Sequence, residues 1–209
     1  MKMRLLLAAA LCGAMVVGSL IAEDKKDEAS AEFHAKCPVS GAPAKETSSL
    51  AYKGKKVFFC CDNCPKAFEA DPAKFATKAN AQLLQTGQIV QVACPLTGAK
   101  INPETAIEVG GASVAFCCNN CKGKVEKADA DEQLTLVFAK LDKGFTLQTE
   151  CPVSGEKIDP KSSVEYKGKK VYFCCDGCPA AFEKDPEKYL AKLPQFSEES
   201  EEEAAEETK

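Results

Sequence analysis

Twelve of the thirteen cysteines fall into three groups of four that share one spacing. In each group an opening cysteine is followed by 22 residues, then by two adjacent cysteines, and then by a last cysteine three positions further on. Thiolates are soft ligands that select Zn²⁺ or Cu(I) over hard cations such as Mg²⁺ and Ca²⁺. The spacing therefore predicts up to three Zn²⁺ or Cu(I) ions per chain, and twelve candidate ligands: Cys37, Cys60, Cys61 and Cys64; Cys94, Cys117, Cys118 and Cys121; Cys151, Cys174, Cys175 and Cys178.

The same cysteines permit two other interpretations. In an exported protein, oxidising conditions could pair the twelve into six disulfides, giving a stapled structural or interaction protein. Alternatively, Cys61-x2-Cys64 and its copies could carry out thiol–disulfide exchange, although that motif usually lies on a βαβ scaffold that this sequence does not predict. Convergence of thiols at a turn, a strand end and a helix start favours the metal. Because no other catalytic constellation is visible, we expect no enzymatic activity.

A turn and a hairpin must position these cysteines. Each opening cysteine starts a Cys-Pro-x-Ser/Thr-Gly phrase, which is typical of a tight turn because Pro fixes φ and Gly accepts positive φ. In the third copy, residues 164–166 and 171–173 flank a Lys-Gly-Lys-Lys turn and predict a β-hairpin that ends at the cysteine pair, and Gly110-Gly111 marks the bend in the second. Short β segments at 89–92 and 145–147 precede the second and third copies.

A helix is expected to begin at the last cysteine of each group. Pro65 and Pro179 follow directly after that cysteine, and Pro is well suited to the first turn of a helix. The unpaired amides and the dipole at a helix start stabilise an anion. We therefore expect lowered thiol pKa values at Cys64, Cys121 and Cys178.

The groups recur at intervals of 57 residues, so the chain consists of three tandem copies of one module. A unit of about 45 ordered residues rarely folds on a hydrophobic core alone, and each copy needs a metal or disulfides as a staple. We predict an α+β fold of three small modules that resemble treble clefs or zinc fingers. The predicted organisation is a signal peptide at 1–22, a charged linker at 23–32, modules at 33–80, 90–137 and 147–193, and a disordered acidic tail at 197–209.

The cysteine pattern resembles that of the YHS domain and its relative, the TRASH domain, small metal-binding modules marked by one cysteine, about twenty residues, and Cys-x3-Cys. The Phe-Glu-x-Asp-Pro-x-Lys-Phe/Tyr endings at 68–75 and 182–189 are also similar, and the resemblance covers about residues 33–193. It implies ligands at Cys37, Cys60 and Cys64; Cys94, Cys117 and Cys121; Cys151, Cys174 and Cys178. It also implies that a metal transporter or a metalloprotein is a partner.

This sequence departs from the family pattern in two ways. Cys61, Cys118 and Cys175 occupy a position where the family commonly has another residue, and each could complete a four-thiolate site, since Cys-x2-Cys is a common zinc spacing. The middle copy lacks the Asp-Pro ending, so its site is kept while its helix has diverged.

His34 lies three residues before Cys37 and could be taken for a ligand. The equivalent positions in the other copies are Gln91 and Gln148, so two of the three modules have no imidazole there. We expect His34 to be a polar residue that faces solvent.

The N-terminal residues are typical of an export signal. Lys2 and Arg4 precede an uncharged run at 5–22, and an acidic pair follows. Cys12 would be removed with the signal, and the mature protein would be periplasmic or secreted. The alternative is an uncleaved N-terminal membrane anchor, because eighteen residues are at the lower limit for a bilayer span. No other stretch predicts a membrane span.

The charge pattern argues against nucleic acid as a partner. The formal net charge is −4, and residues 197–209 hold seven glutamates and one lysine, which leaves the rest of the chain close to neutral. There is no basic surface signature. A self-repelling run of glutamates without an apolar face predicts a disordered, solvated tail.

Overall fold

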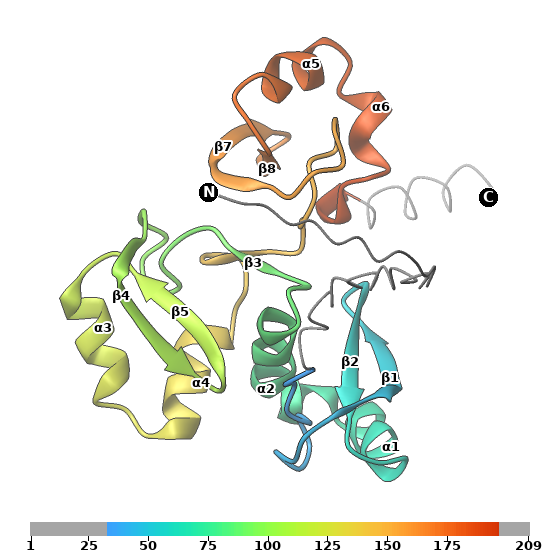
Figure 1. Ribbon diagram of the computed structural model, residues 1–209, viewed down its shortest axis with the longest axis vertical. Helices are drawn as coiled ribbons and strands as arrows, with labels where there is room; N and C mark the ends of the chain where they lie inside the picture. The colour runs from blue at the N-terminus through green and yellow to red at the C-terminus, as the bar shows by residue number, and fades with distance from the viewer. Residues whose placement is uncertain (1–32, 197–209) are drawn as a thin grey trace, which may run out of the picture. The chain divides into compact units, whose positions relative to one another are not determined.

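The computed structural model describes residues 33–196, and the predicted signal peptide, charged linker and acidic tail lie outside them. The architecture is α+β, as predicted, with two-stranded sheets and short helices in three repeated modules (Figure 1). Each module consists of a turn, an antiparallel hairpin and two helices. The hairpins are β1 (Lys45–Tyr52) with β2 (Lys55–Phe59), β4 (Asn102–Val109) with β5 (Ala112–Phe116), and β7 (Asp159–Tyr166) with β8 (Lys169–Phe173).

The helices follow the hairpins directly. The first helix of each module begins at the last cysteine or one or two residues before it: α1 (Asn63–Ala70), α3 (Asn119–Glu126) and α5 (Cys178–Lys184). The second helices differ in length: α2 (Pro72–Gln85), α4 (Ala130–Phe138) and α6 (Glu187–Leu190). Within residues 33–196, no helix combines the length and apolar character that crossing a bilayer requires.

Side chains of aspartate start two of these second helices. Asp71 accepts a hydrogen bond from the Lys74 N–H at 3.2 Å, and Asp129 accepts one from the Glu132 N–H at 2.8 Å. Such N-caps satisfy amides that have no partner inside the helix. Pro72 at the first position of α2 has no N–H to satisfy.

Short strands precede the second and third modules. β3 (Val90–Gln91) pairs antiparallel with β6 (Phe145–Thr146), within the two β segments that the sequence predicts. Their pairing with each other could not be predicted, because the two segments are far apart in the sequence.

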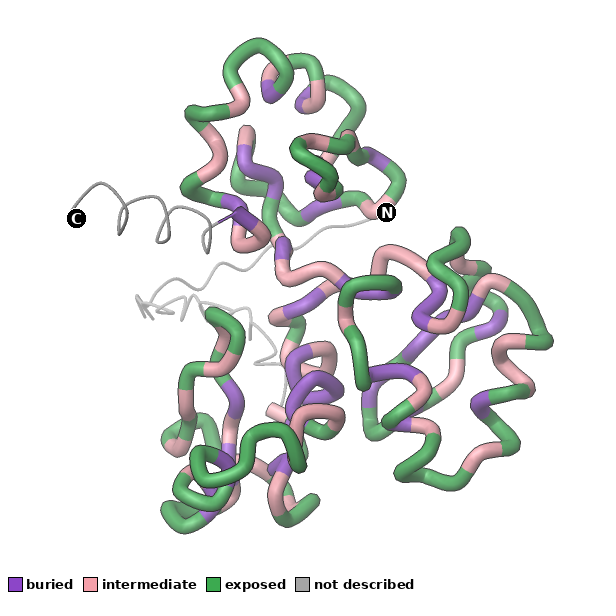
Figure 2. The backbone as a smooth tube through the Cα atoms, turned by 180° about the vertical axis from the view of Figure 1, so that it is seen from behind, coloured by how far each residue is buried: buried purple, intermediate pink, exposed green. Residues whose placement is uncertain are grey.

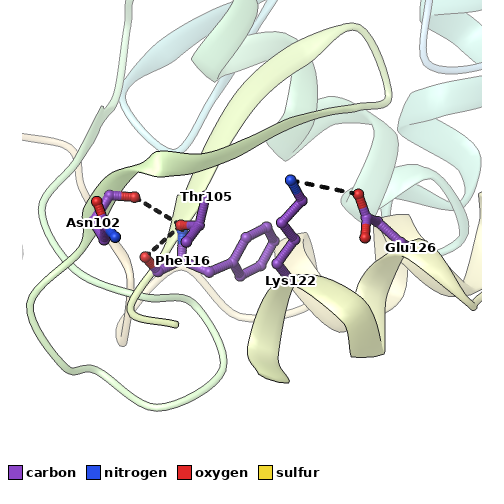
Figure 3. A network of polar contacts seen from close by, with 5 residues as sticks. All are labelled: Asn102, Thr105, Phe116, Lys122 and Glu126. Atoms are coloured by element: carbon purple, nitrogen blue, oxygen red, sulfur yellow. Dashed lines mark hydrogen bonds and ion pairs between the residues drawn. The ribbon is translucent and has the colours of Figure 1, made fainter. Parts of the chain in front are cut away.

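Every hairpin contains an irregularity in its long strand, and a buried hydroxyl compensates for it in the second module. The register of β4 shifts between Asn102 and Ile107. Thr105, only 2% exposed, places its Oγ1 2.6 Å from the Phe116 carbonyl oxygen and accepts a hydrogen bond from the Phe116 N–H at 2.8 Å (Figure 3). The side chain thus supplies hydrogen bonds that the interrupted ladder lacks.

One continuous hydrophobic core serves the first two modules, and the third module has its own. Phe59, Leu83, Phe116 and Phe138 are fully buried in the shared core, whereas Phe173 belongs to the separate one. Many of the buried residues, purple in Figure 2, lie on α2 and on the second strand of each hairpin, β2, β5 and β8. The middle module therefore packs on the first.

Helix α2 carries most of that packing, and it lies against α4 and β5. Asn80 donates from Nδ2 to the Phe138 carbonyl oxygen at 2.8 Å, and Gln85 accepts from the Lys36 N–H at 3.2 Å while donating to the Gly110 carbonyl. In the middle module, whose helical sequence diverges, α4 thus lies on a surface that α2 covers.

The hairpin tip of the middle module shows the same adaptation. The tips of the other two are Lys-Gly turns, but here Gly110 has φ of +63° and packs against both α2 and α4. A Cβ atom on Gly110 would lie 2.5 Å from Leu134 Cδ2 and 3.5 Å from Ala81 Cβ. The bend predicted at Gly110-Gly111 is confirmed. Gly111 also has positive φ, +89°, and a Cβ atom there would lie 3.1 Å from Gln85 Nε2.

Candidate metal centres

Three cysteine triads lie within the described residues, one in each module. In each triad the ligand sulfurs are within 4.8 Å of one another. We call their members the opening cysteines (Cys37, Cys94, Cys151), the strand-end cysteines (Cys60, Cys117, Cys174) and the helix-start cysteines (Cys64, Cys121, Cys178). These are the positions at turn, strand end and helix start that the sequence indicated.

The sulfur spacing fits a metal ion. Strand-end and helix-start sulfurs are 3.6, 3.7 and 3.6 Å apart in the three modules. A tetrahedral thiolate site with metal–sulfur bonds of about 2.3 Å needs sulfur–sulfur distances of about 3.8 Å. A disulfide would need about 2.05 Å, and all twelve described cysteines are unpaired.

A tight turn fixes each opening cysteine. In the first module the Cys37 N–H donates to the Ala42 carbonyl and the Gly41 N–H donates to the Cys37 carbonyl, both at 2.8 Å. Gly41 has φ of +75°, which side chains strongly disfavour. The turn directs the opening thiol inward, and Cys37 is only 1% exposed.

A hydroxyl next to each triad was missed by the sequence analysis. Ser40 Oγ lies 3.2 Å from Cys60 Sγ, and Thr97 and Ser154 hold the same position at 3.5 and 3.2 Å from Cys117 and Cys174. The same hydroxyl accepts a backbone N–H two residues later in the turn. Its signal was present, because all three opening phrases have Ser or Thr before the Gly.

These turns lower the pKa of the opening thiols. Burial acts to raise the pKa of Cys37, but hydrogen bonds from the Ser40 hydroxyl and from backbone N–H groups outweigh it, and the pKa falls to about 7. The same opposing effects bring the pKa values of Cys94 and Cys151 to about 7. The opening cysteine is therefore the first thiolate of each triad to form near neutral pH.

The lowered pKa predicted for the helix-start cysteines is wrong for the metal-free thiols. Burial, followed by hydrogen bonds to the neighbouring thiols, raises the pKa of Cys121 to about 12 and that of Cys64 and Cys178 still further. The helix start does not prevail, because burial disfavours the charged form of these thiols, and the nearby opening thiolate adds a smaller repulsion.

The fourth cysteine of each group lies outside the triad. We call Cys61, Cys118 and Cys175 the outer thiols; all three are exposed to solvent. Cys61 Sγ is nevertheless only 3.5 Å from Cys64 Sγ. Hydrogen bonds, led by those from the backbone N–H groups of Asn63, Cys121 and Gly177 respectively, lower the pKa of the outer thiols.

A glutamine amide ties the turn to the hairpin in the second and third modules. Gln91 donates from Nε2 to the carbonyls of Ala93 and Ala115 at 3.1 and 2.6 Å, and its Oε1 accepts from the Ala115 N–H at 2.9 Å. Gln148 makes the equivalent three bonds in the third module. In both modules the glutamine bonds the residue that precedes the opening cysteine and the residue two positions before the strand-end cysteine.

The first module has the same clamp from a different element. Gln82, on α2, donates to the carbonyls of Lys36 and Phe58 at 2.8 and 2.7 Å and accepts from the Phe58 N–H at 2.7 Å. Gln82 is fully buried. We refer to these three sets of bonds as the amide clamps.

The expectation that His34 faces solvent agrees with its exposure, and the residue is not part of the triad. Its position corresponds to Gln91 and Gln148, which hold the amide clamps of the other modules. Because Gln82 supplies the amide in the first module, the clamp there does not require a glutamine at position 34.

Comparison with known proteins gives one result. The family model of the YHS domain matches residues 35–79 and 150–192, which lie in the first and third modules. No curated protein and no solved structure gives a match. The middle module is not matched, although its triad and hairpin follow the same pattern. The first and third modules of this cysteine-rich chain are thus similar to the YHS domain over residues 35–79 and 150–192, and each of these segments contains one complete triad that could hold a metal ion.

Proposed function

We propose that this protein is exported and binds Zn²⁺ or Cu(I) outside the cytoplasm, where it buffers the metal or delivers it to another protein. The observation that carries the proposal is the set of three cysteine triads, each with a buried opening cysteine. Sulfur-only ligands favour these two metals. Export rests on the N-terminal sequence, Lys2 and Arg4 before an uncharged run.

The triads support binding rather than turnover. The three sulfurs of each triad converge within 4.8 Å of one another, as ligands of one metal ion must. The protein therefore acts without a catalytic step, with a metal transporter or a metalloprotein as its partner.

Native mass spectrometry of protein from the exported fraction, with a parallel count of free thiols, tests this function. We expect three metal ions per mature chain. Structural Zn²⁺ in so small a unit contributes on the order of 10 kcal/mol, so a chelator should unfold the modules. Six disulfides and no retained metal would overturn the proposal and support the stapled alternative.

A further inference from the structure

We propose that the outer thiols are exchange ligands, through which a metal ion enters and leaves each triad by way of a partner's thiolates. This proposal rests on the proposed function, since it concerns the route of the same metal. It assigns a role to Cys61, Cys118 and Cys175 that the triads leave open.

The cysteines of each module form a gradient of burial. The outer thiol is exposed, the strand-end cysteine is half-buried, and the opening cysteine is at most 1% exposed. The same order holds in all three modules. A metal ion therefore has one sulfur-lined route from solvent to the deepest ligand.

The distances along this route allow direct transfer. Cys61 Sγ lies 3.5 Å from Cys64 Sγ, and Cys118 Sγ lies 3.7 Å from Cys117 Sγ. Cys175 Sγ lies 3.7 Å from Cys174 Sγ and 3.6 Å from Cys178 Sγ. One metal ion can bridge sulfurs at such separations, with bonds of about 2.3 Å to each.

The exchange balances bond by bond. An outer thiol loses its proton and binds the metal as one partner sulfur leaves and takes up a proton. The triad sulfurs then replace the remaining partner sulfurs in the same way, and finally a water molecule replaces the outer sulfur at the metal while that sulfur takes up a proton. Each step makes one metal–sulfur bond and breaks one, with no change of oxidation state.

The test uses the full chain loaded with Zn²⁺ under reducing conditions. The variant carries Cys61→Ser, Cys118→Ser and Cys175→Ser together, and zinc transfer to a metal-free four-cysteine peptide is followed by stopped flow. We expect three bound zinc ions and affinity within about threefold of wild type, but transfer slowed by about tenfold or more.

The matched control is Ser49→Ala, Ser113→Ala and Ser163→Ala, one uncharged exposed position on each hairpin that contributes to neither the triads nor the outer thiols. It should transfer zinc at the wild-type rate. Unchanged transfer in the cysteine variant would overturn the proposal, and so would loss of zinc or of more than about tenfold in affinity, which would make the outer thiols resident ligands. Failure of the wild-type chain to retain metal would overturn the proposed function itself.

Discussion

At the scale of single residues, each metal-free triad contains one thiol that ionises near neutral pH and one that stays protonated. The opening thiol has a pKa of about 7, and the pKa of its helix-start neighbour is raised. Metal binding must remove the remaining protons. Uptake of metal is thus coupled to proton release, and affinity should rise with pH.

The number of protons released should depend on pH in a defined way. At a pH of about 5.5 the opening thiol is protonated and releases a proton on binding, whereas at about 8.5 it is already ionised. The helix-start thiol releases its proton at both. Calorimetry in buffers of different ionisation enthalpy should find roughly one proton fewer per module at the higher pH. Equal release at both values would contradict the pKa assignment.

The two members of the adjacent cysteine pair should not be equivalent. Cys60 belongs to the triad and Cys61 does not. Cys60→Ser should therefore weaken the first site by more than the 10- to 100-fold typical of supporting residues, whereas Cys61→Ser should leave its affinity within a few fold. Competition with a chromophoric chelator measures both. Equal losses would mean that the pair acts as a unit.

At the scale of elements, the amide clamps place the turn and the hairpin in register before metal arrives. Gln91→Ala leaves three backbone groups of Ala93 and Ala115 without partners. Supporting residues of metal sites typically contribute 10- to 100-fold in affinity, and we expect a loss of that size for one of the three ions. Stepwise zinc titration by native mass spectrometry would detect it.

Gln133→Ala is the control in the same module, because the Gln133 side chain donates to the Ala128 carbonyl, which is not part of the triad. It should leave all three affinities unchanged. A Gln91→Ala protein that binds three ions as tightly as the control would show that the clamp serves folding alone.

The two hairpin tips give a further pair of variants. Gly54 and Gly110 both have positive φ, +67° and +63°, so alanine at either costs about 1–2 kcal/mol. Only Gly110 is crowded, by Leu134, and overpacking adds about 1–3 kcal/mol. Denaturant unfolding of the metal-loaded chain should show Gly110→Ala to be the less stable. Equal stability would contradict the packing of this tip on α2 and α4.

At the scale of the whole molecule, the shared core couples the first two sites. Replacing Cys37, Cys60 and Cys64 by Ser should expose amides to hydrogen exchange in the second module as well, because both modules share Phe59, Leu83 and Phe138. Replacing Cys151, Cys174 and Cys178 should loosen the third module alone, which has its own core. Exchange confined to one module in both variants would contradict this coupling.

The triads and hairpins could be predicted because their signals are local and repeated three times. The Cys-Pro-x-Ser/Thr-Gly turn depends on residues adjacent in sequence, and the helix starts on Pro65 and Pro179. The pairing of β3 with β6, the packing of α2 on α4 and the role of Gln82 depend on distant contacts. The order of the thiol pKa values could not be predicted, because burial and hydrogen bonding in the folded module set it.

The change in the source of the amide clamp limits how these modules can be transplanted. Gln82 lies beyond residues 35–79 and Gln148 before residues 150–192, so a segment cut at the limits of either family match leaves its glutamine behind. The second segment also loses Leu193 and Phe196 from its core. A segment that carries one complete site on its own therefore has to span residues 147–196. The first site can be moved only together with α2 and the middle module that covers it.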